Sequence, residues 1–181
     1  MPSFPLTFPT NTKLAPKSID FTSKTIATQF RSPYTGKTQT YRYGGQWWEL
    51  TLTYAPLFQS DAEELTGFLN ALAGTSGTFT YKLPSKFLIS ANVGITTTAT
   101  GNDFTVSSGT VQVGKYGYDG SSNRLVQFTT ATSLFPKLSP SISYTINTTS
   151  GTNLRLATND INFSVDEMML TGITVPFVEA I

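Results

Sequence analysis

The sequence contains neither cysteine nor histidine. Without cysteine, disulfides and thiolate chemistry are impossible, so a small secreted scaffold held together by disulfides is excluded. Without histidine, the chain lacks the commonest general base and the commonest metal ligand of proteins. Nucleophiles of the Ser-His-Asp and Cys-His types are therefore excluded as well.

Carboxylates are the remaining groups that could carry out catalysis or bind a metal ion. No Asp-rich loop has the ligand spacing of a calcium site. A glycosidase needs two carboxylates that face each other across a cleft, and the sequence gives no reason to choose a pair among its 11 acidic residues. We therefore predict that the protein is not an enzyme, and that it has no catalytic residue, no metal site and no cofactor.

Charge is also scarce. Only 13% of the residues are charged and the formal net charge is +1, so the chain lacks the basic excess of a nucleic-acid clamp. The charges are uneven, because residues 1–60 carry six basic and two acidic groups and residues 61–181 carry six basic and nine acidic groups. This polarity could orient identical subunits as they meet, although chance scatter of so few charges gives the same pattern.

Long apolar runs are missing too. No segment approaches the length that spans a membrane, and the first residues lack a basic stretch followed by an apolar run. We therefore expect a protein that is made in a cytoplasm and stays soluble there.

What the sequence has in abundance is threonine, with 31 copies, and aromatic residues, at 13%. Branched and aromatic side chains pack well on a pleated sheet, so the composition predicts an all-β protein. Residues 46–54 are the clearest strand, because Trp48, Leu50 and Leu52 alternate with polar positions. Residues 25–32 and 37–44 predict two further strands joined by a turn at 33–36, and Gly44-Gly45 predicts a second turn.

One segment, residues 60–73, predicts an α-helix. Leu65, Phe68, Leu69 and Leu72 form one apolar stripe, which we expect to cover the sheet face that carries Trp48. Ser60 and Glu63 have the spacing of a capping box.

The length of the predicted strands and the frequency of turns change twice along the sequence, which predicts two domains. Residues 87–157 hold short, threonine-rich segments separated by turns, as in a small β-barrel. Residues 1–86 and 158–181 then form a discontinuous β domain that contains the helix. Within it, the proline-rich residues 1–24 predict an extended arm with a short strand near residues 19–21. An ordered arm that cannot pack on its own subunit often lies across a neighbouring one.

Three aromatic residues are candidates for an interface. Trp47 lies on the polar face of its strand, and Tyr116 and Tyr118 flank a glycine beside a predicted hairpin turn. Exposed aromatics of this kind contact partner proteins or stack on sugar rings. One of the two tyrosines could equally belong to the core.

The order of several short motifs resembles a known family. They are Trp47-Trp48-Glu49-Leu50, Ala55-Pro56-Leu57, the helical residues 61–72, and Gly77-Thr78-Phe79-Thr80-Tyr81. Later matches include Phe135-Pro136-Lys137-Leu138 and the final Phe177-Val178-Glu179-Ala180-Ile181. Together, residues 25–181 resemble minor tail proteins of long-tailed bacteriophages (siphophages), and within them the distal tail protein family.

This resemblance implies a fold and a role. The fold would be a tail-tube-like β-sandwich or split barrel with one helix and an inserted OB-like barrel. The role would be a homo-oligomeric ring in the virion, a hexamer as is usual in the family, between the tail-tube protein and the tail-tip or baseplate hub protein. Side fibres or a host-surface glycan are further partners that the resemblance allows, and DNA would only pass through the channel. Two alternatives remain open at this point, a carbohydrate-binding β-module and the tail-tube protein itself.

Overall fold

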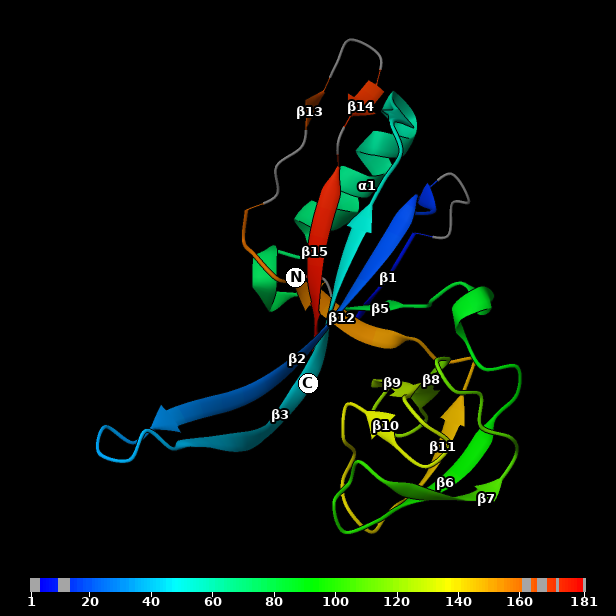
Figure 1. Cartoon of the computed structure of the whole chain (residues 1–181). Helices are drawn as coiled ribbons and strands as arrows, with labels where there is room; N and C mark the ends of the chain where they lie inside the picture. Colours follow the sequence, from blue (N-terminus) through cyan, green and yellow to red (C-terminus); the bar gives the residue numbers. More distant parts are fainter. Residues whose placement is uncertain (1–3, 10–13, 161–163, 166–168, 172, 181) are drawn as a thin grey trace.

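The computed structural model describes residues 4–9, 14–160, 164–165, 169–171 and 173–180 (Figure 1). Within them the protein is all-β with one α-helix, as the sequence predicted. The strands form two six-stranded sheets and one three-stranded sheet.

The first sheet gathers strands from both ends of the chain, in the order β1-β5-β12-β15-β3-β2. The members are β1 (Leu6–Thr7), β5 (Phe79–Tyr81), β12 (Thr152–Leu156), β15 (Thr174–Glu179), β3 (Thr38–Thr53) and β2 (Ser18–Arg31). All neighbours are antiparallel except β1 and β5, which are parallel. β3 lies next to the edge strand β2, and Trp48, Leu50 and Leu52 of its inner half are buried.

The second sheet is built from the middle of the chain and curls around a core of its own (Figure 1). Its order is β10-β9-β8-β11-β6-β7. The members are β6 (Val93–Thr97), β7 (Phe104–Ser108), β8 (Tyr116–Asp119), β9 (Leu125–Phe128), β10 (Leu134–Phe135) and β11 (Ser143–Asn147). The third sheet, β13-β14-β4, is made of β13 (Ser164–Val165), β14 (Met169–Thr171) and β4 (Leu57–Phe58).

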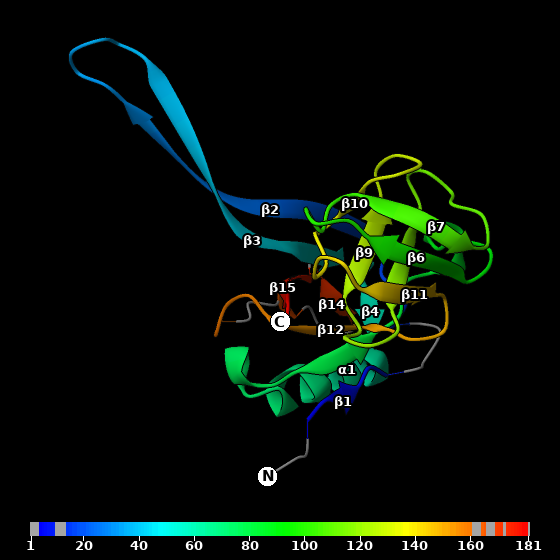
Figure 2. The ribbon, with the colours of Figure 1, turned by 90° about the horizontal axis from the view of Figure 1, so that it is seen from below.

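The helix α1 (Gln59–Ala71) covers one face of the first sheet (Figure 2). Its Leu65 and Leu69 are buried in the same core cluster as Leu50 and Leu52 of β3. The packing predicted from the apolar stripe is therefore confirmed. The predicted capping box is wrong, because the N-cap residue is Phe58 and no side chain caps the first turn.

The two main sheets share part of one core. The cluster beneath α1 also contains Tyr118 and Leu125 from the second sheet, so apolar burial holds the two sheets together. The strand β12 corrects the predicted boundary at 157, since it pairs with β5 and β15 in the first sheet and not with the inserted segment.

The first residues pack on their own subunit. Leu6 pairs with Phe79, and the ring of Phe8 lies 5.3 Å from those of Phe68 and Tyr81. Leu14 is buried, and residues 18–24 belong to β2. The described part of the predicted arm therefore packs on its own subunit, and the short strand expected near residues 19–21 is part of β2.

No helix in the described part of the chain is long and apolar enough to cross a membrane.

Candidate functional site

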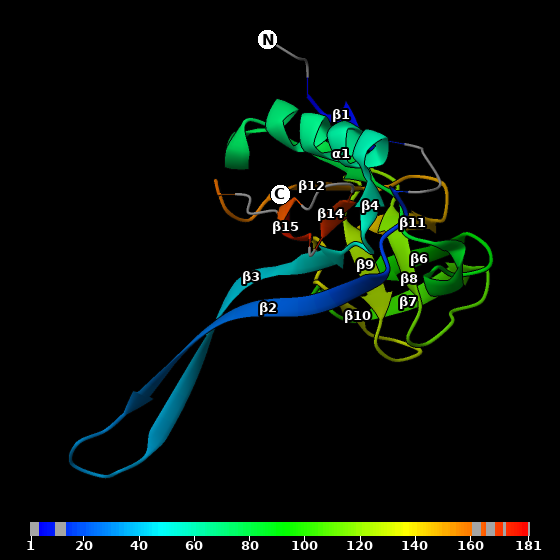
Figure 3. The same ribbon diagram turned by 90° about the horizontal axis from the view of Figure 1, so that it is seen from above.

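Two very long strands, β2 and β3, pair from Ser18 opposite Thr53 to Arg31 opposite Thr38. Their inner halves belong to the body of the molecule, and their outer halves project from it as a free-standing hairpin (Figures 1 and 3). Residues 24–45 are called the projecting hairpin below. Threonines and aromatic residues, which prefer strands, are frequent along it.

The pairing is irregular where the hairpin leaves the body. Thr25 is opposite Gln46 and Ala27 is opposite Arg42, so β3 contains extra residues at this point. Such a bulge bends the strand and increases its twist. The turn predicted at Gly44-Gly45 is therefore wrong, since β3 runs through both residues.

The tip is a tight, hydrogen-bonded turn that is closed by residues 32 and 37 and contains the turn predicted at residues 33–36. Ser32 N–H donates to the carbonyl of Lys37 over 2.9 Å, and Gly36 N–H donates to the carbonyl of Ser32 over 3.0 Å. The Ser32 hydroxyl also accepts from Thr35 N–H over 3.2 Å. Gly36 has a φ of 64°, a left-handed conformation that glycine adopts without strain.

The surface of the projecting hairpin is apolar and basic. Among the residues whose exposure the structure describes, the large exposed hydrophobic ones are Ile26 (45%), Phe30 (61%), Tyr34 (97%) and Tyr41 (64%). The basic Arg31, Lys37 and Arg42 are exposed too, and residues 24–45 contain no acidic residue. A gathering of exposed apolar side chains on a soluble protein marks an interaction surface.

The base of the hairpin rests on an aromatic cluster. The ring of Phe21 stacks on Tyr116 with 4.8 Å between centroids, and Trp48 meets Tyr116 edge-on at 5.6 Å and Phe135 at 4.9 Å. These residues come from β2, β3, β8 and β10, so the cluster ties the root of the hairpin to the second sheet.

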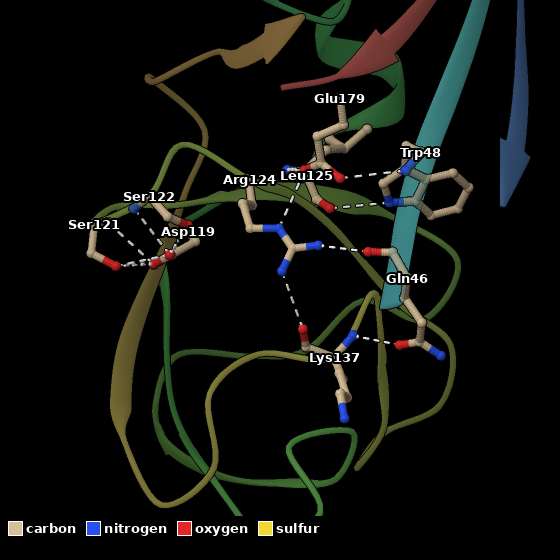
Figure 4. Close-up of polar contacts among 9 residues, drawn as sticks. All are labelled: Gln46, Trp48, Asp119, Ser121, Ser122, Arg124, Leu125, Lys137 and Glu179. Carbon is tan, nitrogen blue, oxygen red and sulfur yellow. Dashed lines mark hydrogen bonds and ion pairs between the residues drawn. The ribbon is translucent and has the colours of Figure 1, made fainter. Parts of the chain in front are cut away.

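A buried polar network completes this junction (Figure 4). Glu179 is 2% exposed, and its carboxylate accepts from the backbone N–H groups of Trp48 over 3.3 Å and Leu125 over 3.1 Å. The guanidinium of Arg124 lies 3.6 Å from the same carboxylate and donates to the carbonyl of Gln46 over 2.9 Å. The side chain of Glu179, at the end of β15, is thus bonded to Trp48 of the first sheet and to Leu125 of the second.

Trp48 strengthens the same junction with its side chain. Its indole Nε1–H donates to the carbonyl of Leu125 over 3.0 Å. Gln46, two residues earlier, accepts from Lys137 N–H over 2.8 Å through its side-chain oxygen. The hydrogen bonds and the aromatic contacts together fix the orientation of the root of β3, and hence of the projecting hairpin.

Burial raises the pKa of Glu179 above its ordinary value of 4.5, although Arg124 and the two backbone amides lower it. A carboxyl group with a raised pKa binds its proton more tightly in the folded protein than in the unfolded chain. Its contribution to stability is therefore complete below the unfolded pKa and is lost as the pH rises through the folded pKa.

We accordingly expect the pH dependence of stability to change when Glu179 is replaced by Gln, which cannot titrate. As the pH falls from neutral towards the ordinary carboxyl pKa, the wild-type protein should gain free energy of unfolding relative to Glu179→Gln. Denaturant unfolding of both proteins across this pH range measures the difference, in which the other carboxylates cancel. Two parallel curves would show that Glu179 titrates normally.

The structure separates the three residues predicted as interface candidates. Tyr118 is fully buried, and its hydroxyl oxygen accepts from Leu83 N–H over 2.7 Å, so it is a core residue and the prediction is wrong. Tyr116 is half-buried, and its ring stacks on Phe21 in the aromatic cluster. Trp47 is half-buried on the opposite face of the sheet, beside a groove of about 380 Å³ that Glu49, Arg155 and Val178 also line.

The exposed aromatics of the projecting hairpin were missed by the sequence reasoning. The signal was present, because residues 24–45 combine four basic residues and several aromatic ones without any acidic residue. The wrongly predicted turn at Gly44-Gly45 hid this signal, because it divided the 16-residue strand β3 into two strands of ordinary length.

No catalytic constellation or metal centre emerges from the described residues. No group of three or more acidic side chains among them lies close enough to hold a metal ion. Asp119, a buried carboxylate, accepts hydrogen bonds from the backbone and hydroxyl groups of Ser121 and Ser122 (Figure 4), which is the arrangement of a structural turn. No protein-family model and no curated protein sequence matches the chain.

Proposed function

We propose that the protein is a non-enzymatic structural subunit that assembles with copies of itself into a closed ring, the distal tail ring of a long-tailed phage. The ring would join the tail tube to the tail-tip or baseplate proteins and leave a channel for DNA. Two things support this: the resemblance of residues 25–181 to minor tail proteins, and the projecting hairpin.

The projecting hairpin carries the proposal. An isolated two-stranded hairpin is marginally stable in water, and this one exposes Phe30, Tyr34 and Tyr41 along its length. A protein partner would bury these side chains and hold the strands in place. The contact would be heterologous, since the hairpin of one subunit would meet a different surface of the next. Heterologous contacts form rings when the rotation between subunits closes and open polymers when it does not.

The two alternatives differ in what they require. A carbohydrate-binding module needs an exposed aromatic platform, and of Trp47, Tyr116 and Tyr118 the first two are only half-buried, whereas Tyr118 is fully buried. A tail-tube protein would use the same hairpin but would polymerise. The size of the assembly separates these functions, because they imply a monomer, a closed ring and a long tube respectively.

A single substitution on the hairpin tests the proposal. Phe30→Asp should lower the assembled fraction at least about tenfold, because a central aromatic anchor of an interface contributes about 2 kcal/mol or more. Native mass spectrometry and negative-stain micrographs give the assembly state, and denaturant unfolding should show unchanged stability. Val113, which is 59% exposed on the inserted segment, provides the matched control Val113→Asp, which should assemble normally. A wild-type protein that remains a monomer at high concentration and in assembled particles would refute ring formation.

A further inference from the structure

The projecting hairpin carries charge of one sign. Its four basic residues and lack of acidic ones give +4, so the rest of the chain carries −3 to make the formal net charge of +1. Lys24 is paired with Glu49 at the root of the hairpin, 3.2 Å away, and the three other cations lie further out and exposed. A surface that receives the hairpin should therefore be both apolar and acidic.

The body of the molecule has one described surface that combines these properties. Its large exposed hydrophobic residues are Phe4, Phe58, Val106, Val113 and Ile142. Phe58 is the most exposed of them, at 61%, and it directly precedes α1, whose first two turns carry the exposed Glu63 and Glu64. No acidic residue lies within four positions of Phe4, Val113 or Ile142 along the sequence. Val106 has one carboxylate within four positions, that of Asp103, against the two exposed glutamates that follow Phe58. Hydrogen bonding does not distinguish the two places, since Asp103 accepts from Ser133 and Glu63 accepts from Gln59 over 3.0 Å.

The position of this surface suits a contact between copies. The beginning of α1 and the tip of the projecting hairpin lie at opposite ends of the molecule in all three ribbon views (Figures 1, 2 and 3). A hairpin therefore cannot reach the Phe58 surface of its own chain. In addition, Phe58 belongs to β4, which is an edge strand of the three-stranded sheet in the described part of the chain.

We infer that the projecting hairpin of one copy docks on the surface of a second copy formed by Phe58, Glu63 and Glu64. The aromatic residues of the hairpin cover Phe58, and its arginine and lysine side chains face the two glutamates. This inference rests on the proposed self-assembly and names the two surfaces that meet. It makes the subunits join head to tail.

The absence of cysteine makes a direct test possible, because every introduced thiol is unique. A chain with both Tyr34→Cys and Phe58→Cys should form disulfide-linked dimers and higher oligomers on mild oxidation, since a disulfide needs Cα atoms within about 7 Å. The matched control combines Tyr34→Cys with Ile142→Cys, another exposed hydrophobic position. At equal protein concentration, the control should give at least about tenfold less linked product if docking at Phe58 supplies the proximity.

A charge exchange tests the same pairing without oxidation. Arg31→Glu with Lys37→Glu reverses the hairpin, and Glu63→Lys with Glu64→Lys reverses the receiving surface. Each double variant alone should lose assembly at least about tenfold, because like charges then face each other. A one-to-one mixture should assemble again, since each hairpin finds a surface of opposite charge on the other variant.

The outcomes are separable. If the wild-type chain does not assemble, the proposed function fails and the inference fails with it. If the wild-type chain assembles but the Tyr34–Phe58 pair links no better than its control, or the mixture does not recover, the hairpin docks elsewhere and only the inference is overturned. A third outcome is that the wild-type protein retards a DNA duplex in a gel, and that reversing the hairpin charges abolishes this binding but leaves assembly intact. The hairpin then binds nucleic acid, and the inference is overturned as well.

Discussion

Replacing Phe79 with alanine is expected to lower the free energy of unfolding by about 3–5 kcal/mol, the usual cost of truncating a large aromatic side chain in a core. Phe79 is fully buried on β5, and its ring lies 5.3 Å from Phe68 of the helix and 5.0 Å from Phe177 of β15. Its loss would leave a cavity between α1 and the first sheet. Denaturant unfolding of the wild-type and variant proteins measures the change.

The control for this prediction is the same substitution at an exposed position. Phe30→Ala removes an equal side chain from the projecting hairpin, where 61% of the residue is exposed, and should change the stability of the isolated subunit by about 0.5 kcal/mol or less. Equal destabilisation by the two substitutions would show that the helix does not rest on β5.

Trp48→Ala is expected to cost about 3–5 kcal/mol as well, and to uncouple the two sheets. The indole is 4% exposed, packs against Phe135 of the second sheet and donates the hydrogen bond to Leu125. After its removal, we expect the second sheet to unfold at a lower denaturant concentration than the first. Unfolding followed by circular dichroism and by hydrogen exchange would resolve the two transitions, whereas a single unchanged transition would contradict the prediction.

Two further substitutions divide this cost into its parts. Trp48→Phe keeps most of the apolar contact but leaves the Leu125 carbonyl without its donor, which should cost about 1–3 kcal/mol. Trp47→Ala changes the neighbouring residue on the opposite, half-buried face and should destabilise the subunit much less than Trp48→Ala. If Trp47→Ala proves as costly as Trp48→Ala, the assignment of the two faces of β3 is wrong.

Local periodicity was sufficient to predict the centre of the fold. The alternation of Trp48, Leu50 and Leu52 and the helical stripe that includes Leu65 and Leu69 correspond to the two surfaces that meet in the core. Both patterns follow from burial of one face of an element, which any partner of the right size satisfies. The turn at residues 33–36 was predictable for a similar reason, since proline and glycine fix its backbone locally.

The features that were wrongly predicted depend on contacts distant in sequence. Gly44 and Gly45 lie inside β3, where its pairing with β2 is irregular, and the atoms nearest to a Cβ atom at either position are the flexible ends of the Lys137 and Ile26 side chains. A glycine pair in a sequence does not distinguish an irregular strand from a turn. Tyr118 likewise has the local surroundings of a hairpin tyrosine, and only the fold brings Leu83 to its hydroxyl.

The candidate interface was the hardest part to predict. Its residues are ordinary for a strand, and their exposure follows from the distance between the hairpin and the body. The sequence contains the charge bias of residues 24–45, but nothing in it indicates that β2 and β3 continue past the edge of the body.

The continuity of β3 also determines how the molecule would bear a mechanical load. The strand runs without a break from the hairpin tip to Thr53, and its inner part is paired with β15 from Glu49 opposite Val178 to Thr53 opposite Thr174. The hydrogen bonds between antiparallel strands lie perpendicular to the strands. Tension applied along the hairpin would therefore shear all of these bonds together, and the subunit would resist stretching better than a protein whose strands separate one bond at a time.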